Sequence, residues 1–205
     1  MKHRPFIYFD MGNVLLTFSH QKGARQMAEV SGIAPELAWR VVFDDGLHWE
    51  YERGEISDKE FHERFCKATG SQPDLAALER AGSDIFEVNL PVLPLLSRLR
   101  TNGCQLGVLS NTSAAHWRFV TREFPVVFEM FEVFALSFQI GSMKPDAAIY
   151  QRAQLLADVP AAELLFFDDR PENVAAAKLQ GWDAAVFSDA ATFARDLENR
   201  GILLH

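Results

Sequence analysis

Asp10 stands at the end of a short apolar run, residues 6–9, and the turn residues Gly12 and Asn13 follow it closely. An aromatic and β-branched run that ends in a carboxylate and a turn is typical of a buried parallel strand. In open α/β sheets, ligands bind beyond the carboxyl ends of the strands, where the strand order switches. The sequence therefore predicts that Asp10 lies at a ligand-binding edge of a sheet.

Three further polar groups follow along the chain, each beside an apolar run or at the start of an expected helix. They are Ser110-Asn111, Lys144 and Asp168-Asp169. With Asp10 they supply a carboxylate, a hydroxyl with an amide, a lysine and a pair of acids. Metal-assisted phosphoryl transfer to an aspartyl nucleophile needs such a set. We therefore expect these residues to meet in one site.

The motifs around these residues resemble those of the haloacid dehalogenase superfamily of hydrolases, in the same order. The segments that carry the resemblance are 9–14, 52–57, 109–112, 143–145 and 166–169. Within the superfamily they look like those of the bacterial α-D-glucose-1-phosphatases. The resemblance covers nearly the whole chain. It implies an α/β fold with a Rossmann-like, doubly wound parallel sheet as the core and an inserted, all-helical cap.

The resemblance also assigns a role to each group. Asp10 would attack phosphorus and form an aspartyl-phosphate, which divides the hydrolysis into two steps. Ser110 and Asn111 would donate hydrogen bonds to the phosphoryl oxygens, and Lys144 would neutralise the phosphate and the Asp10 carboxylate. Each group also has an ordinary structural explanation: a strand-end cap, a helix N-cap or a solvated lysine before a helix.

A magnesium site is implied by the same resemblance. Its protein ligands would be Asp10, the carbonyl of Gly12, Asp168 and Asp169. Asp169 would bind the ion directly, and Asp168 would bind it directly or through water. Mg²⁺ prefers few carboxylates, several waters and a substrate oxygen, which agrees with this ligand set. Asn173 is expected to orient the acid pair or Lys144, and simple capping of the next helix is the alternative for the acid pair.

Gly12 departs from the wider family. Most phosphatases of the superfamily have an aspartate two residues after the nucleophile, and it protonates the leaving group. Gly12 has no proton to give, so this contribution, typically ~10²–10⁴-fold, must come from another group or be absent. The glucose-1-phosphatase pattern also has glycine here. His116 is one candidate for the acid, because imidazole titrates near neutral pH.

Polar and aromatic residues gather at 44–53, in the expected cap. Such groups suit a sugar, and we expect His48, Glu52, Arg53 and His116 to influence substrate specificity. A helix with aromatic residues in this region is, however, more often simply packed.

From residue 90 onward the sequence alternates between strand and helix patterns. The expected strands are 106–109, 133–136, 164–167 and 184–187, and the expected helices are 91–100, 171–180, 190–199 and two that begin near 113 and 145. Repeated strand–helix units predict a mostly parallel sheet that is covered by helices on both faces.

Residues 18–89 show helical periods and no strong strand signal. Helices are expected at 21–30, 36–43 and 74–88, and the capping box that starts at Ser57 opens another. We expect a catalytic core formed by 1–17 and 90–205, and a helical cap formed by 18–89 over the carboxyl end of the sheet.

Composition limits the possible partners. The 205 residues are 48% hydrophobic, the net charge is −8, and no run of Lys or Arg exceeds two residues. A nucleic-acid partner or an attracting membrane surface would require a basic face, so neither is expected. Cys66 and Cys104 have neither a disulfide framework nor metal-ligand spacing. We expect a small phosphorylated substrate and a monomer or weak homodimer.

The N-terminus could be mistaken for a signal peptide, because basic residues precede an apolar run. Asp10 and Asn13 interrupt that run, and no small-residue cleavage site follows. No window reaches the length of a membrane span. A cytoplasmic enzyme is therefore expected.

Three functions are consistent with these sequence features. The first is a Mg²⁺-dependent phosphatase that hydrolyses a small phosphorylated metabolite, such as the sugar phosphate α-D-glucose 1-phosphate, through an aspartyl-phosphate. The second is a 2-haloacid dehalogenase-type hydrolase. Against it, Gly12 replaces the aromatic residue of dehalogenases, and the retained acid pair suits a metal. The third is a phosphate-binding pseudoenzyme that is disabled by Gly12.

Overall fold

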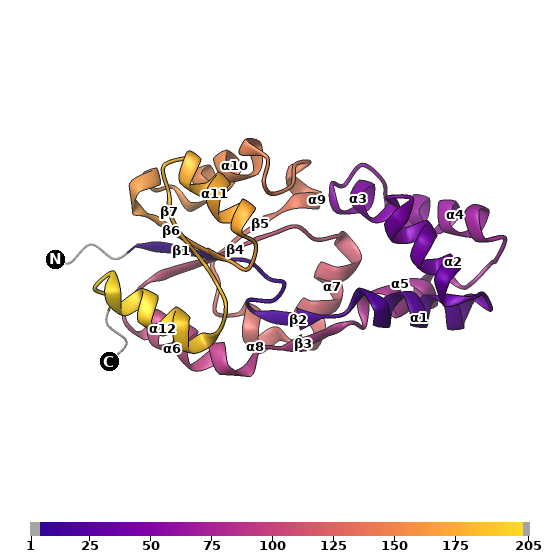
Figure 1. Ribbon diagram of the computed structural model, residues 1–205, viewed down its shortest axis with the longest axis horizontal. Helices are drawn as coiled ribbons and strands as arrows, with labels where there is room; N and C mark the ends of the chain where they lie inside the picture. The colour runs from indigo at the N-terminus through magenta and orange to yellow at the C-terminus, as the bar shows by residue number, and fades with distance from the viewer. Residues whose placement is uncertain (1–4, 203–205) are drawn as a thin grey trace.

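The computed structural model describes residues 5–202. The ends of the expected core, 1–4 and 203–205, lie outside the described residues, as do the basic residues of the signal-like N-terminus. Within the described range, no helix is both long and apolar enough to cross a membrane. The molecule is elongated, and a sheet with its helices forms one part while helices from 20–83 gather at the opposite end (Figure 1).

The core is a sheet of five parallel strands in the order β5-β4-β1-β6-β7. Their bounds are β1 Phe6–Phe9, β4 Gln105–Ser110, β5 Val133–Leu136, β6 Leu164–Asp168 and β7 Asp183–Val186. The chain adds β4 and β5 on one side of β1 and then β6 and β7 on the other, so the strand order switches at β1. The expected Rossmann-like parallel sheet is confirmed.

Both faces of the sheet are buried, because each strand places alternate side chains on opposite sides. Ile7 and Phe9 pack on one face, and Phe6 and Tyr8 pack on the other. Helices α6 (Leu93–Thr101) and α12 (Ala190–Asn199) cover the Phe9 face, whereas α10 (Ala147–Ala157) and α11 (Pro171–Leu179) cover the Tyr8 face (Figure 1). The sheet is therefore doubly wound, as expected.

Shorter helices complete the core. They are α7 Ala114–Glu123, α8 Pro125–Phe128, α9 Ser137–Ile140 and the 3₁₀ turns η2 Leu90–Val92 and η3 Ala161–Glu163. Ser113 caps α7 by accepting a hydrogen bond from the His116 N–H, and the helix begins there as its sequence predicts.

The inserted segment is built mainly from helices around its own apolar cluster, which includes Met27, Phe65 and Leu78. The helices are α1 His20–Ser31, α2 Pro35–Trp39, the π-helical turn η1 Arg40–Asp44, α3 Leu47–Glu52, α4 Asp58–Thr69 and α5 Leu75–Ser83. The predicted capping box is present at the start of α4, where Ser57 and Glu60 each bond the backbone N–H of the other.

One part of the segment 18–89 differs from the prediction. The helix expected at 74–88 ends at Ser83, and β3 (Phe86–Val88) pairs antiparallel with β2 (Leu16–Phe18). Strands of three residues are too short to show alternation, and their pairing joins segments far apart in the sequence. This two-stranded ribbon carries the chain into the helical insert and back out of it.

Candidate active site

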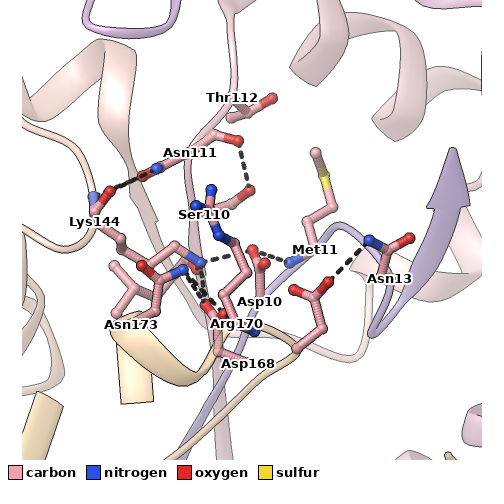
Figure 2. Close-up of polar contacts among 12 residues, drawn as sticks. Asp10, Met11, Asn13, Ser110, Asn111, Thr112, Lys144, Asp168, Arg170 and Asn173 are labelled. Atoms are coloured by element: carbon pink, nitrogen blue, oxygen red, sulfur yellow. Dashed lines mark hydrogen bonds and ion pairs between the residues drawn. The ribbon is translucent and has the colours of Figure 1, made fainter. Parts of the chain in front are cut away.

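The carboxyl ends of β1, β4 and β6 bring the predicted polar residues together (Figure 2). Asp10 directly follows β1, and its N–H donates to the carbonyl of Phe167 at 2.9 Å. Ser110 ends β4 on one side of it, and Asp168 ends β6 on the other. The switch in strand order at β1 therefore places the three side chains around one point.

The side chain of Lys144 extends from a loop and contacts two of these groups. Its Nζ lies 2.8 Å from Asp10 Oδ1 and 2.6 Å from Asp168 Oδ2, and it donates to the carbonyl of Leu109 at 2.9 Å. Its side chain is only 1% exposed. Burial acts to lower the pKa of Lys144, but the two carboxylates outweigh it and raise that pKa above its ordinary value. The amine is thus a charged group held between two acids.

Asp168 is fully buried and has its oxygens occupied by donors. Oδ2 accepts from Lys144, and Oδ1 accepts from the Arg170 N–H at 2.8 Å. Asn173 Nδ2 reaches both oxygens, at 2.9 and 3.1 Å (Figure 2). Asn173 therefore fixes the orientation of Asp168, which in turn orients Lys144.

Asp169 is half-buried and is held by a residue that the motifs did not single out. Asn13 Nδ2 donates to Asp169 Oδ2 at 2.9 Å (Figure 2). Asn13 adopts a φ of 55°, in the left-handed region that asparagine tolerates better than most residues. The Gly-Asn pair marks a turn in the sequence, but the contact with Asp169 depends on the fold.

Asp10, Asp168 and Asp169 form an acid cluster in which one ligand oxygen from each lies within 4.8 Å of the others. The pKa of Asp10 is raised to about 7: burial is the main cause, Asp168 and Asp169 contribute to the rise, and Lys144 opposes it. One lysine does not balance three carboxylates. Hard oxygen donors with excess negative charge fit a hard divalent cation.

The Asn111 side chain, which we expected to bind a phosphoryl oxygen, contacts the backbone of Lys144 in this structure. Its Nδ2 donates to the carbonyl of Lys144 at 2.9 Å, and its Oδ1 accepts from the Lys144 N–H at 2.8 Å (Figure 2). The amide thus binds the backbone of the lysine loop instead of pointing its donor at a phosphoryl group. Ser110 is 1% exposed, and its hydroxyl donates to the Asn111 carbonyl at 3.2 Å.

A pocket of about 140 Å³ opens over these groups, between the core and the insert. The core side of its lining includes Asp10, Gly12, Asn13, Lys144 and Asp169, and the insert side includes His20, His48, Trp49 and Glu52. We call this space the reaction pocket. A substrate bound to the core groups would therefore be covered by the insert.

Phe18 occupies the space beside Gly12. A Cβ atom built on Gly12 would lie 2.7 Å from a carbon of the Phe18 ring, well inside van der Waals contact. The ring also contacts Phe86 and His20. The position where most family phosphatases carry their acid is thus filled by an aromatic side chain, which the spacing of the motifs could not reveal.

Glu52 reaches the reaction pocket from the end of α3, which is docked onto the core. The Glu52 carbonyl accepts from Ser137 Oγ at 2.6 Å. Two residues later, Gly54 approaches the backbone of Phe138 so closely that a Cβ atom would lie 2.2 Å from its carbonyl oxygen. The pKa of Glu52 is raised to about 7: burial is the main cause, the Asp10 carboxylate contributes to the rise, and Lys144 opposes it.

His48 also lines the reaction pocket, whereas Arg53 does not. His48 Nδ1 lies 2.9 Å from the Val42 carbonyl, so we assign the proton to Nδ1 and leave Nε2 as the acceptor. Arg53 is exposed and lies outside the lining of the pocket. The expectation that Arg53 contacts the substrate is therefore not supported by its position.

His116 lies elsewhere, buried against the insert. Its Nε2 is 3.2 Å from the Gly82 carbonyl, and its ring packs edge-on against Phe86. Burial lowers the pKa of His116 to about 4. It lies outside the lining of the reaction pocket and is neutral near pH 7, so it does not supply the acid expected from the sequence.

A second cavity of about 70 Å³ lies between the insert and the start of α7, and it shares His20, His48 and Glu52 with the reaction pocket. Most of its remaining wall is apolar and includes Met27, Phe61 and Leu78. We call it the apolar cavity. Because the two spaces have walls in common, a group that extends from the reaction pocket would meet this apolar surface.

Known proteins are similar in sequence to most of this chain. Sesquiterpene phosphatase astK of Aspergillus oryzae is 25% identical over 191 residues, which cover 92% of this chain and 92% of that protein. D-ribitol-5-phosphate phosphatase of Bacteroides thetaiotaomicron is 24% identical over 198 residues, covering 93% of this chain and 95% of that protein. Both relatives are named as phosphatases, and they act on different classes of phosphate.

A solved structure shows the same fold. A haloacid dehalogenase family enzyme of Bacteroides thetaiotaomicron, in complex with magnesium and inorganic phosphate, superposes with a TM-score of 0.79 at 22% identity. The match covers 91% of this chain and 95% of that one. A family model described as haloacid dehalogenase-like hydrolase matches residues 7–181 of the sequence. The chain therefore belongs to the haloacid dehalogenase-like hydrolases.

Proposed function

We propose that the protein is a Mg²⁺-dependent phosphatase that hydrolyses small phosphate monoesters through an aspartyl-phosphate on Asp10. The observation that carries this proposal is the buried ion-pair network of Lys144 with Asp10 and Asp168, with Asp169 beside it. The phosphatase names of the two relatives and the magnesium and phosphate in the similar structure support it.

The geometry suggests how Asp10 would act. Its Oδ1 already accepts from the Met11 N–H at 2.7 Å and from Lys144. These two donors hold the carboxylate in place and leave Oδ2 for the attack on phosphorus. Lys144 carries the positive charge that lets the phosphate approach a carboxylate. Ser110 lies at the adjacent strand end, where its hydroxyl would bind a phosphoryl oxygen after leaving the Asn111 carbonyl.

The metal would be held by the acid cluster. Asp10 and Asp169 line the reaction pocket, and Asp168 is already bonded to Lys144, Arg170 and Asn173. We therefore assign Asp10, Asp169 and the carbonyl of Gly12 as direct ligands, and Asp168 as a ligand through water. Bound Mg²⁺ would offset the charge of the phosphoryl group and align it for in-line transfer.

A sugar phosphate such as α-D-glucose 1-phosphate is the substrate we propose first. His20, His48, Trp49 and Glu52 give the insert side of the reaction pocket both polar groups and an aromatic face. Such a wall suits the hydroxyls and apolar faces of a sugar. The resemblance of the motifs to those of the α-D-glucose-1-phosphatases supports this choice, as does the activity named for the ribitol-phosphate relative.

A second substrate class is favoured by the apolar cavity. Its wall of Met27, Phe61 and Leu78 would accept an apolar part of the leaving group better than a hydroxylated one. The relative from Aspergillus oryzae is named for a sesquiterpene phosphate. An isoprenyl monophosphate is therefore the alternative to a sugar phosphate for the same chemistry.

Phosphate release from p-nitrophenyl phosphate tests the proposed reaction. We expect release that depends on Mg²⁺, stops when EDTA is added and is absent in Asp10→Asn. Release of chloride from 2-chloropropionate without a metal would instead support the dehalogenase, and phosphate binding without turnover would support the pseudoenzyme. A panel of sugar phosphates and isoprenyl monophosphates then ranks the two substrate classes by kcat/KM.

A further inference from the structure

The site lacks an acid beside its nucleophile, and the structure shows why one cannot simply be restored there. Gly12 has no side chain, and the Phe18 ring fills the adjoining space, 2.7 Å from where a Cβ would stand. A phosphate ester with an ordinary alcohol as its leaving group still needs a proton when the P–O bond breaks. The proton must therefore come from another wall of the reaction pocket.

Few carboxylic acids line the reaction pocket, which limits the possible proton donors. Among the described residues that line it, the acids are Asp10, Asp169 and Glu52. Asp10 and Asp169 belong to the acid cluster, where they serve the nucleophilic attack and the metal. Glu52 is the remaining acid, and it belongs to the insert side of the pocket lining, whereas Asp10 belongs to the core side. The leaving group of an in-line displacement departs on the side away from the nucleophile.

The histidines of the same wall are poorly suited to donate a proton. Burial lowers the pKa of His20 to about 4, with His48 adding to the decrease, and burial also lowers the pKa of His48. Both rings are therefore neutral near pH 7 and have no proton to give as imidazolium. Burial and the Asp10 carboxylate, by contrast, raise the pKa of Glu52, which keeps a proton on its carboxyl group.

Glu52 is also held in place. Its carbonyl accepts from Ser137 Oγ, and the close approach of Gly54 to Phe138 fixes the chain just beyond it. No hydrogen bond engages its carboxyl group within residues 5–202. Its backbone is thus anchored to the core while its side chain stays available to a ligand. An acid that acts on a substrate needs both properties.

We infer that Glu52 is the general acid of the reaction and replaces, from the insert, the carboxylic acid that is absent at position 12. This inference rests on the proposed phosphatase function. In the first step Asp10 forms a bond to phosphorus, the bond from phosphorus to the leaving oxygen breaks, and that oxygen takes the Glu52 proton. In the second step water attacks phosphorus, the bond from phosphorus to the Asp10 oxygen breaks and frees the Asp10 carboxylate, and the Glu52 carboxylate takes a proton from the attacking water. The products are an alcohol and phosphate.

Glu52→Gln tests the inference through its dependence on the leaving group. The quantity kcat/KM includes the departure of the leaving group but not the later hydrolysis of the aspartyl-phosphate. For an alkyl phosphate, which needs the proton, we expect kcat/KM to fall by ~10²–10⁴-fold. For p-nitrophenyl phosphate, whose leaving group is stable as an anion, we expect a fall of less than about tenfold. Glu55→Gln, which changes an exposed acid just after the end of α3, should change neither value.

The wild-type enzyme supplies a second measurement that does not depend on a folded variant. Across a series of aryl phosphates, kcat/KM should change little with the pKa of the leaving group, because the departing oxygen is protonated. A steep dependence in the wild type would overturn the inference, as would an equal loss for both substrates in Glu52→Gln. If the wild type hydrolyses none of these esters, the proposed function itself fails, and the two failures are therefore distinguishable.

Discussion

At the scale of residues, the site depends on a chain of buried contacts that ends at Asp10. Asn173 holds Asp168, Asp168 holds Lys144, and Lys144 contacts Asp10. Each group in this chain is at least nine-tenths buried as a residue. In such surroundings a charged group that loses a partner is strongly destabilised. The geometry of the nucleophile therefore depends on an amide that does not itself contact it.

Asn173→Ala should make this dependence measurable. The substitution removes the Nδ2 donor from both oxygens of a fully buried carboxylate. We expect the free energy of unfolding in urea to fall by about 1.5–3 kcal/mol, the usual range for hydrogen bonds to charged groups. Glu172→Ala is the control, because its ion pair with Arg170 lies at the surface and should contribute much less to the free energy of unfolding. Equal losses in the two variants would contradict the assignment.

The contact of Gly12 with Phe18 gives a second test at this scale. In Gly12→Ala the new methyl group meets the Phe18 ring, which must then shift. We expect a double-mutant cycle with Phe18→Ala to show a coupling of about 0.5–3 kcal/mol in unfolding free energy, since the methyl is tolerated once the ring is gone. Additive effects in urea unfolding would show that the ring does not fill this space.

Sequence patterns could locate these residues but not all of their contacts. Asp10, Ser110 and Asp168 lie at strand ends, and local apolar runs reveal strand ends. Asn13 contacts Asp169 across 156 positions of sequence, and Phe18 meets Gly12 only because the chain turns between them. Nothing local shows which way an amide points, so the bonding of the Asn111 side chain to the backbone of Lys144 could not be predicted.

At the scale of elements, the insert is fastened to the core by the loop after α3. Gly54 has a φ of 71°, and its Cα faces the backbone of Phe138. This close approach, together with the hydrogen bond from Ser137 to Glu52, joins α3 to α9 beside the reaction pocket. The docking of the insert thus depends on a residue that lacks a side chain.

Gly54→Ala should therefore undock the insert locally. The new Cβ would lie 2.2 Å from the Phe138 carbonyl oxygen, in addition to the strain of a left-handed alanine. Gly70→Ala is a matched control, because its φ is 70° and nothing lies within 4 Å of its Cβ. We expect Gly70→Ala to lose about 1–2 kcal/mol of unfolding free energy. Gly54→Ala should lose more unfolding free energy than Gly70→Ala, and its kcat/KM should also fall. Equal losses of unfolding free energy in the two variants would show that the approach to Phe138 is unimportant.

The insert should also select the substrate. His48 lines both the reaction pocket and the apolar cavity, whereas Arg53 is exposed and lines neither. His48→Ala should change the ratio of kcat/KM between a sugar phosphate and an isoprenyl phosphate by about tenfold, the effect of roughly one lost contact. Arg53→Ala should leave that ratio unchanged. A uniform decrease for all substrates in His48→Ala would show that the insert closes the site without selecting.

The regular strands and helices of the core differ from the short two-stranded ribbon in how well the sequence predicts them. The strand at 133–136 and the helix at 190–199 have the predicted bounds, because their apolar periods and end signals are local. The ribbon of β2 and β3 was missed, since strands of three residues have no readable period and are stabilised by pairing across the chain. The helix expected at 74–88 was wrong beyond Ser83 for the same reason.

At the scale of the whole molecule, we expect the sheet core and the insert to have different roles. The sheet edge holds the nucleophile, Lys144 and the acid cluster, and the insert covers them with Glu52, His20 and His48. The first set would treat every phosphate ester alike, and the second meets the part that differs between esters. Apart from the proton that we assign to Glu52, we expect the chemistry to belong to the core and the specificity to the insert, which face each other across the reaction pocket.

The phosphorylated enzyme is the most direct test of this account. The wild type is mixed with p-nitrophenyl phosphate and Mg²⁺, quenched in acid within one turnover, and digested for mass spectrometry. We expect one phosphoryl group on the peptide that contains Asp10, and none in Asp10→Asn or without Mg²⁺. Turnover in Asp10→Asn, or a phosphoryl group on another residue of the active wild type, would contradict Asp10 as the nucleophile.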